Sequence, residues 1–279
     1  MISVKNLKKT YFLGGEEVHA LDDVSLSIKE HEFVAIIGQS GSGKSTFMNM
    51  LGCLDRPDSG EITLDGTDIL KCKEKELSVI RNKKIGFIFQ QFHLLPKLSA
   101  LENVELPLIY QGMPTKKRRE KAVKALKAVG LEKRMNHKPN QLSGGQQRRV
   151  ALAGVLAMDP EVLILDEPAA GLDPKGRDKI LGQIKQYHEK YGKTILLVSH
   201  SMEDIVKYAG KVLVMNKSRL FCYDTVDRVF ARTEELAKIG LDVPQVTRMS
   251  HILKSLGTDI GNDIYTTERA AERLLPLIR

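Results

Sequence analysis

The chain has no tryptophan and, among its 279 residues, only three cysteines: Cys53, Cys72 and Cys222. They are far apart in the sequence and match no metal-ligand spacing, which indicates reduced thiols in a cytosolic protein rather than a zinc motif. No apolar run approaches the roughly twenty residues that a membrane helix needs. The first residues, Met1 to Lys5, lack the apolar core of a signal peptide. We therefore expect a soluble protein that reaches a membrane only through a partner.

Charge and composition leave several functions open. The 43 lysines and arginines exceed the 35 aspartates and glutamates by eight, a surplus compatible with nucleic acid, an anionic membrane surface or neither. Basic residues are scattered among acidic ones, except in the run Lys116-Lys117-Arg118-Arg119, which we interpret as a solvated helix face. A hydrophobic fraction of 42% supports a sizeable core.

A glycine-rich loop is the most informative stretch. It follows an apolar, β-branched run at 33–37 and precedes a helical pattern at 46–54. The loop matches G-x-x-x-x-G-K-[ST] and consists of Gly38, Gln39, Ser40, Gly41, Ser42, Gly43, Lys44 and Ser45. Its backbone N–H groups and the positive end of the following helix form a nest for phosphate oxygens. With Lys44 at the outer phosphates and Ser45 at a Mg²⁺ ion, the loop predicts a nucleoside triphosphate site.

Two other strands are predicted to bring polar groups to the same edge of the sheet. Residues 161–165 form an apolar run typical of a central parallel strand, which ends at Asp166 and Glu167; the run at 194–198 is followed by His200. Ligands of α/β sheets bind at the carboxyl ends of the strands. We therefore expect Asp166 to hold Mg²⁺, Glu167 to orient or deprotonate the attacking water, and His200 to donate to the γ-phosphate.

A second anion site is predicted at the start of a helix over 150–158. The residues before it are Ser143, Gly144, Gly145 and Gln146. Serine is a favoured N-cap and glycines expose backbone N–H groups. Because the chain already has its own phosphate loop, we expect this second site to serve the phosphate held by another copy.

The remaining segments alternate between strand and helix patterns. Residues 1–30 predict antiparallel strands separated by a turn at Gly14-Gly15. Tyr11, just before that turn, is either an aromatic that stacks on a base or an ordinary edge-strand residue. Further strands are predicted at 61–64 and 85–89.

Helices dominate two other parts of the chain. Residues 97–129 predict helices interrupted at Pro107 and again at 112–114. In the tail, helices are predicted over 226–239, after Pro244 and over 266–278.

Taken together, these motifs resemble the nucleotide-binding subunits of ABC transporters over nearly all of residues 1–220. The resemblance implies that Glu167, His200 and Gln90 take part in catalysis, Gln90 as the Q-loop glutamine and His200 as the switch histidine. It implies metal ligands in Ser45, Gln90 and Asp166. The nucleotide-binding residues that it implies are Tyr11, the Walker A loop from Gly38 to Ser45 with Thr46, the signature residues Ser143, Gly144, Gly145 and Gln146, and Asp173 of the D-loop.

The same resemblance implies a fold class and a division into domains. The expected fold is α/β, a P-loop NTPase of ABC type with a mixed sheet core, an antiparallel β subdomain, an inserted α-helical subdomain and a C-terminal helical tail. We expect an ATPase domain over 1–224, with its helical subdomain at about 92–158, and a C-terminal extension over 225–279. The extension either packs against the core or, as in the resemblance to energy-coupling factor (ECF) ATPases, adds dimer contacts.

Two residues depart from the family pattern. His31 stands where glycine is common in a tight turn, and a strained turn with positive φ is expected there. Ala169 stands where threonine is frequent, and the missing hydroxyl is expected to affect packing rather than chemistry.

The two halves of the chain resemble different subfamilies. Residues 1–147 are similar to the lipoprotein-release and macrolide-export type, through 52–60, 92–96 and 100–108. Residues 148–279 are similar to ECF ATPases, through 148–158, 169–177 and 239–246. We therefore hypothesise a chimeric chain joined near 147.

The expected function is ATP hydrolysis that energises a membrane transporter through ATP-driven dimerisation. The expected cofactors are ATP and Mg²⁺, and the expected partners are a second ABC ATPase subunit, identical or not, and integral membrane subunits, at the cytoplasmic face of the membrane. The C-terminal half favours ECF-type uptake of vitamins or metal ions as the transport process, and an ATPase of the lipoprotein-release or macrolide-export type is the alternative. A soluble ABC ATPase acting on nucleic acid or ribosomes is a third reading, although no direct nucleic acid contact is expected. A non-hydrolysing regulatory subunit is disfavoured by the presence of Glu167 and His200.

Overall fold

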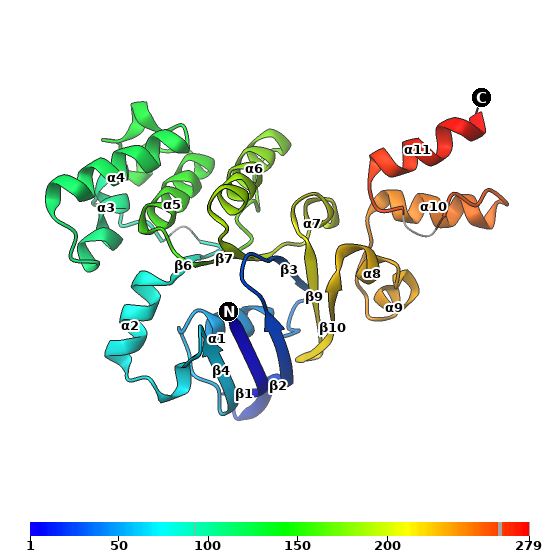
Figure 1. The fold of residues 1–279 in the computed structure, drawn as a ribbon, viewed down its shortest axis with the longest axis horizontal. Coiled ribbons are helices and arrows are strands. Elements are labelled where there is room, and N and C mark those ends of the chain that lie inside the picture. Colours follow the sequence, from blue (N-terminus) through cyan, green and yellow to red (C-terminus); the bar gives the residue numbers. More distant parts are fainter. Residues whose placement is uncertain (92, 262–263, 279) are drawn as a thin grey trace.

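The computed structural model describes residues 1–91, 93–261 and 264–278, and its centre is a six-stranded sheet (Figure 1). The strand order is β10-β9-β3-β8-β7-β6, with β10 antiparallel to β9 and the other neighbours parallel. The strands are β3 (Phe33–Gly38), β6 (Ile85–Ile88), β7 (Val162–Asp166), β8 (Thr194–Val198), β9 (Lys211–Asn216) and β10 (Arg219–Thr225). The two strands β9 and β10 are absent from the sequence predictions.

A second, antiparallel sheet has the order β2-β1-β4-β5. Its strands are β1 (Ile2–Leu13), β2 (Glu16–Ile28), β4 (Ser59–Leu64) and β5 (Thr67–Asp68). The turn between β1 and β2 lies at Gly14-Gly15, as predicted, although the pattern over 16–28 forms one long strand. The mixed core sheet and the antiparallel subdomain together confirm the expected fold class, an α/β P-loop NTPase of ABC type.

The central strands are buried on both faces and divide the core in two. In β7, Leu163 and Leu165 belong to the core beneath the helical subdomain, whereas Val162 and Ile164 belong to the core shared with the antiparallel sheet. This period of two follows from the pleat of a strand. Every residue of β3 is also buried, so the phosphate loop that follows it starts from a fixed point.

The helices surround these sheets. Those outside the helical subdomain and the tail are α1 (Lys44–Leu51), α2 (Glu74–Lys83), α6 (Pro174–Tyr191) and α7 (Met202–Tyr208). Within the described ranges, short 3₁₀ helices cover Ile69–Lys71, Glu132–Arg134 and Pro139–Gln141. Helix α1 ends three residues before the predicted limit, because Gly52 closes it and Cys53 turns to a φ of 55°.

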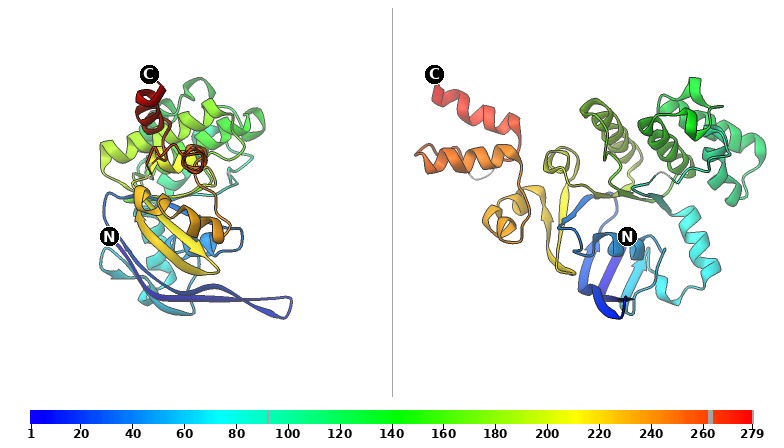
Figure 2. Two further views of the ribbon diagram at one scale, coloured as in Figure 1. Left: turned by 90° about the vertical axis from the view of Figure 1, so that its right-hand side faces the viewer. Right: turned by 180° about the vertical axis from the view of Figure 1, so that it is seen from behind.

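The helical subdomain forms one end of the molecule (Figures 1 and 2) and consists of α3 (Ala100–Tyr110), α4 (Thr115–Ala128) and α5 (Gly144–Met158). Residue 92, where we expect it to begin, lies outside the described residues. The prediction that Pro107 interrupts the helix is wrong, because Pro107 lies inside α3. An interior proline costs about 3 kcal/mol, which the complete burial of Val104 and Leu108 on either side offsets.

The C-terminal helices form the opposite end of the molecule (Figure 2). They are α8 (Val226–Phe230), α9 (Thr233–Lys238), α10 (Gln245–Ser255) and α11 (Thr267–Ile278). The single helix predicted over 226–239 is divided at residues 231–232, and the bend lets Phe230 and Leu236 enter the same core. Pro244 precedes α10, as predicted.

In the part of the chain that the structure describes, no helix combines the length and the apolar character needed to cross a bilayer.

Candidate nucleotide site

The phosphate loop joins the buried strand β3 to helix α1. Gly43 has a φ of 95°, and a Cβ atom there would lie 2.3 Å from the carbonyl oxygen of Ala20, so the loop requires glycine at this point. The ammonium group of Lys44 donates to the carbonyl oxygens of Gly38 at 2.7 Å and Gln39 at 2.8 Å. Burial lowers the pKa of Lys44, and the carboxylates of Glu167 and Asp166 act in the opposite direction.

A hollow of about 470 Å³ opens above this loop. Most of the site residues predicted within one chain line it: Tyr11, Ser40, Gly41, Gly43, Lys44, Ser45, Thr46, Gln90, Asp166, Glu167 and His200. The buried hydroxyl of Ser42 has no hydrogen-bond partner among the described residues, but Ser42 does not line the hollow. Ser45, Gln90 and Asp166 offer oxygen atoms to the same space, and a hard cation such as Mg²⁺ prefers such ligands. The residues present therefore fit a nucleotide with its magnesium ion.

The carboxyl ends of β7 and β8 bring the acidic pair and the histidine together. Asp166 pairs in register with Val198 of β8, and Glu167 Oε1 lies 2.8 Å from His200 Nε2. Glu167 has a φ of 49°, a strained conformation for a residue with a side chain and one often found at functional sites. Burial and the neighbouring carboxylate of Glu167 raise the pKa of Asp166, while Lys44 and His200 oppose that rise.

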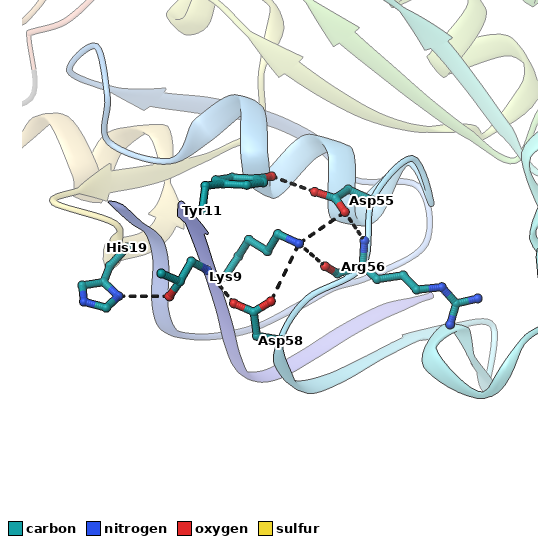
Figure 3. Close-up of polar contacts among 7 residues, drawn as sticks. Lys9, Tyr11, His19, Asp55, Arg56 and Asp58 are labelled. Carbon is teal, nitrogen blue, oxygen red and sulfur yellow. Dashed lines mark hydrogen bonds and ion pairs between the residues drawn. The ribbon is translucent and has the colours of Figure 1, made fainter. Parts of the chain in front are cut away.

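Tyr11 also lines the hollow, and polar contacts hold its side chain in place (Figure 3). Its hydroxyl donates to Asp55 Oδ2 at 2.8 Å, and burial together with this carboxylate raises the pKa of Tyr11 to about 12. The ammonium group of Lys9 lies 5.0 Å from the ring centroid and also bonds Asp55 at 3.3 Å. Tyr11 thus has a fixed ring at the edge of the hollow, in addition to being part of strand β1.

The signature residues and Asp173 do not line this hollow. Ser143 is the N-cap of α5, its hydroxyl accepts from Gln146 N at 3.3 Å, and Gln146 Oε1 accepts from Ser143 N at 2.9 Å. Gly144 and Gly145 form the first turn of α5. Asp173 is the N-cap of α6, followed by Pro174. A single chain therefore presents the phosphate loop and the signature helix as separate surfaces.

The two departures from the family pattern are both accommodated. His31 has a φ of 60°, as expected, its backbone N–H donates to Thr194 Oγ1 at 3.1 Å, and its ring contacts the carbonyl oxygen of Gly192. Ala169 is buried in the core beneath the helical subdomain, a position that favours a methyl group.

Two residues near the site escaped the sequence analysis as functional candidates. Arg148 of α5 is 6% exposed, and its guanidinium donates to the carbonyl oxygen of Ala170, beside the D-loop. Arg148 lies on the same helix face as the buried Leu152. A charged residue at a position where the helical pattern expects an apolar one could have identified it from the sequence. Gly240, in the C-terminal extension, has a φ of 69°, and a Cβ atom there would lie 1.9 Å from Gln39 Nε2. The extension therefore touches the phosphate loop directly.

Comparison with known proteins identifies the family of this site. The family model described as ABC transporter matches residues 21–170. The chain belongs to the ABC transporter family. It is an ATP-binding subunit of an ABC transporter, a class that couples ATP hydrolysis to transport.

Two relatives and one solved structure show how far this similarity extends. The energy-coupling factor transporter ATP-binding protein EcfA2 of Clostridium tetani is 45% identical over 284 residues, which cover 99% of this chain and 96% of the relative. The uncharacterized ABC transporter ATP-binding protein MJ0796 of Methanocaldococcus jannaschii is 48% identical over 219 residues, 77% of this chain and 93% of the relative. A dimeric structure of the MJ0796 cassette in a post-hydrolysis state, bound to ADP and Pi, matches with a TM-score of 0.77 at 44% identity. That match covers 81% of this chain and 99% of the other.

Proposed function

We propose that this ABC transporter ATPase energises ECF-type uptake of a vitamin or a metal ion through ATP-driven dimerisation. The observation that carries the proposal is the 45% identity with an EcfA2 protein over 99% of the chain. The similarity to the MJ0796 cassette covers only 77% of the chain. The similarity to EcfA2 covers 99% and therefore includes the C-terminal extension as well.

Within one chain, the lined hollow binds the nucleotide and positions water. Tyr11 stacks on the base, the Walker A residues hold the phosphates, and Lys44 leaves the carbonyl oxygens of Gly38 and Gln39 for phosphate oxygens. Glu167 accepts a proton from the attacking water, and His200 donates a hydrogen bond to the γ-phosphate as charge develops there. When bound at Ser45, Gln90 and Asp166, Mg²⁺ supplies charge neutralisation between the outer phosphates.

The second half of the site comes from another subunit. Ser143, Gly144, Gly145 and Gln146 begin helix α5 apart from the hollow, and a helix N-terminus rich in free N–H groups favours an anion. In a dimer these residues cap the γ-phosphate held by the partner, with Asp173 near the junction. ATP then joins the two subunits, and hydrolysis releases them. The related MJ0796 cassette is a dimer in its structure bound to ADP and Pi, which supports this arrangement.

The remaining assignments follow from transporter function. The chain acts as a peripheral subunit at the cytoplasmic face of the membrane, and Gln90 and the helical subdomain contact the integral membrane subunits. We assign residues 1–224 to the ATPase domain, with the helical subdomain at about 92–158, and 225–279 to an extension that adds dimer contacts. Exposed Ile252 on α10, Leu256 at its C-cap and Leu275 on α11 support the dimer contact.

A second candidate, an ATPase of the lipoprotein-release or macrolide-export type, rests on residues 52–60 and 100–108. An ABC ATPase acting on nucleic acid or ribosomes is distinguished by steeply salt-dependent RNA binding.

A join near 147 stays a hypothesis. The EcfA2 alignment covers 99% of the chain and therefore crosses that position, and one uninterrupted reading frame with uniform base usage would count against an artificial fusion.

The catalytic assignment is tested by replacing Glu167 with glutamine. Loss of a general base costs roughly 10²–10⁴-fold in rate, while the amide keeps the size of the side chain, so ATP binding and ATP-dependent dimerisation should persist. Steady-state hydrolysis, nucleotide titration and light scattering measure the three properties. Hydrolysis at the wild-type rate would show that Glu167 is not the base.

The transporter type is tested separately by co-purifying the chain with candidate membrane subunits. Stimulation of ATP hydrolysis by an ECF transmembrane subunit, and not by an export permease, is the expected result. The opposite pattern would assign the chain to export.

A further inference from the structure

The positive charge of the chain is concentrated in one short segment. Residues 115–138 contain 10 lysines and arginines against 2 glutamates, a surplus of eight that equals the net charge of the whole chain. The rest of the chain carries 33 residues of each sign. This part, named here the basic segment, comprises α4, the 3₁₀ helix Glu132–Arg134 and the loop to residue 138.

These charges face solvent and are largely unneutralised. Nine of the ten basic side chains are exposed and the other, Arg118, is half-buried. Among the residues that the structure describes, ion pairs hold two of the ten, Arg119 with Glu105 and Lys127 with Glu132. The apolar residues of α4, Ala122, Ala125 and Leu126, are buried on the other side of the helix.

Helix α4 carries this charge at the expense of its own stability. No acidic residue lies in its first turn, and no side chain caps its N-terminus, yet Lys116 and Lys117 lie at this positive end of the helix dipole. Lys117, Lys121 and Lys124 follow one another at spacings of four and three residues, where like charges repel. Charges that weaken the helix in isolation indicate a favourable contact outside it.

Two neighbouring features indicate what that contact is. Ile109 and Tyr110, at the adjoining end of α3, are 48% and 76% exposed, and aromatic side chains beside basic ones favour a membrane–water interface. Farther along the basic segment, Lys127, Lys133, Arg134 and Arg149 line a hollow of about 360 Å³ in which Glu132 is the one acidic residue. Phosphate headgroups bind in such basic hollows.

Nucleic acid is the less suitable occupant. The basic segment contains no phenylalanine, tyrosine or tryptophan, so it lacks the interleaved rings on which the bases of a single strand stack. An exposed aliphatic side chain such as Ile109 makes no favourable contact with a charged phosphate backbone.

We propose that the basic segment binds the surface of anionic phospholipids, so that this subunit contacts the bilayer directly as well as through membrane subunits. The exposed lysines attract the headgroups, the hollow receives a phosphate, and Ile109 and Tyr110 enter the interface. The contact requires neither ATP nor a second subunit. Gln146, which the proposed function assigns to the nucleotide of the partner, also lines the hollow, so the contact is tested without nucleotide.

The test is flotation of the full-length chain, without nucleotide, with vesicles of phosphatidylcholine alone or mixed equally with phosphatidylglycerol. The patch variant carries Lys116→Gln, Lys117→Gln, Lys121→Gln and Lys124→Gln. The control variant carries Lys29→Gln, Lys75→Gln, Lys217→Gln and Lys238→Gln, four exposed lysines outside the basic segment. Both variants have the same net charge, and both should hydrolyse ATP in solution as the unmodified chain does.

We expect binding to the anionic vesicles alone, weakened by salt. Each charge near an anionic surface contributes roughly a fivefold factor in partitioning, so the patch variant should bind about several hundredfold more weakly and the control variant should bind nearly as before. Equal losses in the two variants, binding to neutral vesicles, or no vesicle binding would overturn the proposal. Patch-dependent binding of RNA without vesicle binding would overturn it in favour of nucleic acid. Circular dichroism of both variants checks that α4 still folds.

Discussion

Tyr11 offers a sharp test of the nucleotide site, because its ring and its hydroxyl do different things. The ring borders the hollow, whereas the hydroxyl bonds Asp55 at 2.8 Å (Figure 3). Replacing Tyr11 with alanine removes both. Base–aromatic stacking is worth about 1–3 kcal/mol by alanine substitution, so the Kd for ATP should rise by roughly 5- to 150-fold.

Replacing Tyr11 with phenylalanine removes only the hydroxyl. The lost hydrogen bond should lower the free energy of unfolding by about 1 kcal/mol, while the Kd for ATP should change by less than about threefold, since the ring remains. Isothermal titration in the Glu167→Gln background measures the Kd without turnover, and thermal unfolding measures stability.

Stacking tolerates any base, so GTP affinity should fall in the alanine variant by the same factor as ATP affinity. The stacking role would be refuted if the alanine variant bound ATP as tightly as the unmodified chain. It would also be refuted if the phenylalanine variant lost as much affinity as the alanine variant, since the hydroxyl and Asp55 would then carry the effect.

Three other predictions follow from individual contacts in the structure. Arg148→Gln should lower kcat about tenfold with little change in KM, because the guanidinium fixes the carbonyl oxygen of Ala170 beside the D-loop. Arg81→Gln is the control, since it loses a bond to the carbonyl oxygen of Cys53, away from the signature residues, and should change stability instead. Equal kcat values for the two variants would contradict this role of Arg148. Gly240→Ala should raise the Kd for ATP several-fold, because its Cβ atom would displace the Gln39 side chain and a positive φ costs about 1–2 kcal/mol. An unchanged Kd would show that the C-terminal extension does not influence nucleotide binding at the phosphate loop. In Glu32, burial alone would raise the carboxyl pKa, but hydrogen bonds from Lys211 and Tyr223 lower it below its ordinary value. Its stabilisation is therefore complete above the unfolded pKa of about 4.3 and is lost as pH falls through the lower folded value, so Glu32→Gln should lower Tm at pH 7 and the difference should disappear in acid; a constant difference across pH would exclude this linkage.

Local patterns predicted most of the fold and of the nucleotide loop. A buried strand, a glycine-rich turn and a helix N-terminus each depend on residues that are neighbours in the sequence. The local pattern therefore also predicted where Lys44 and Asp166 lie. The capping of α5 by Ser143 was equally local. The assignment of roles to these residues remains a prediction.

Strands β9 and β10 and helices α2, α6 and α7 are local elements that the sequence analysis did not predict. The error at Pro107 and the missed contacts have another origin, in packing between different parts of the chain. Pro107 stays inside α3 because the packing of its neighbours outweighs its local preference. The contact of Arg148 with Ala170 joins two elements 22 residues apart, and that of Gly240 with Gln39 joins opposite regions of the sequence. Neither the period of a helix nor the spacing of a motif encodes which segments meet across the core.

The partners of Lys44 bear on how nucleotide affinity arises. Its ammonium group already bonds two carbonyl oxygens of its own loop, so the loop is preorganised before any phosphate arrives. Binding then exchanges one set of oxygen partners for another, and the entropy lost in ordering the backbone has been spent during folding. Affinity at this loop should accordingly reflect the charge of the incoming phosphates more than any gain in order, and an uncharged nucleoside should gain almost nothing from it.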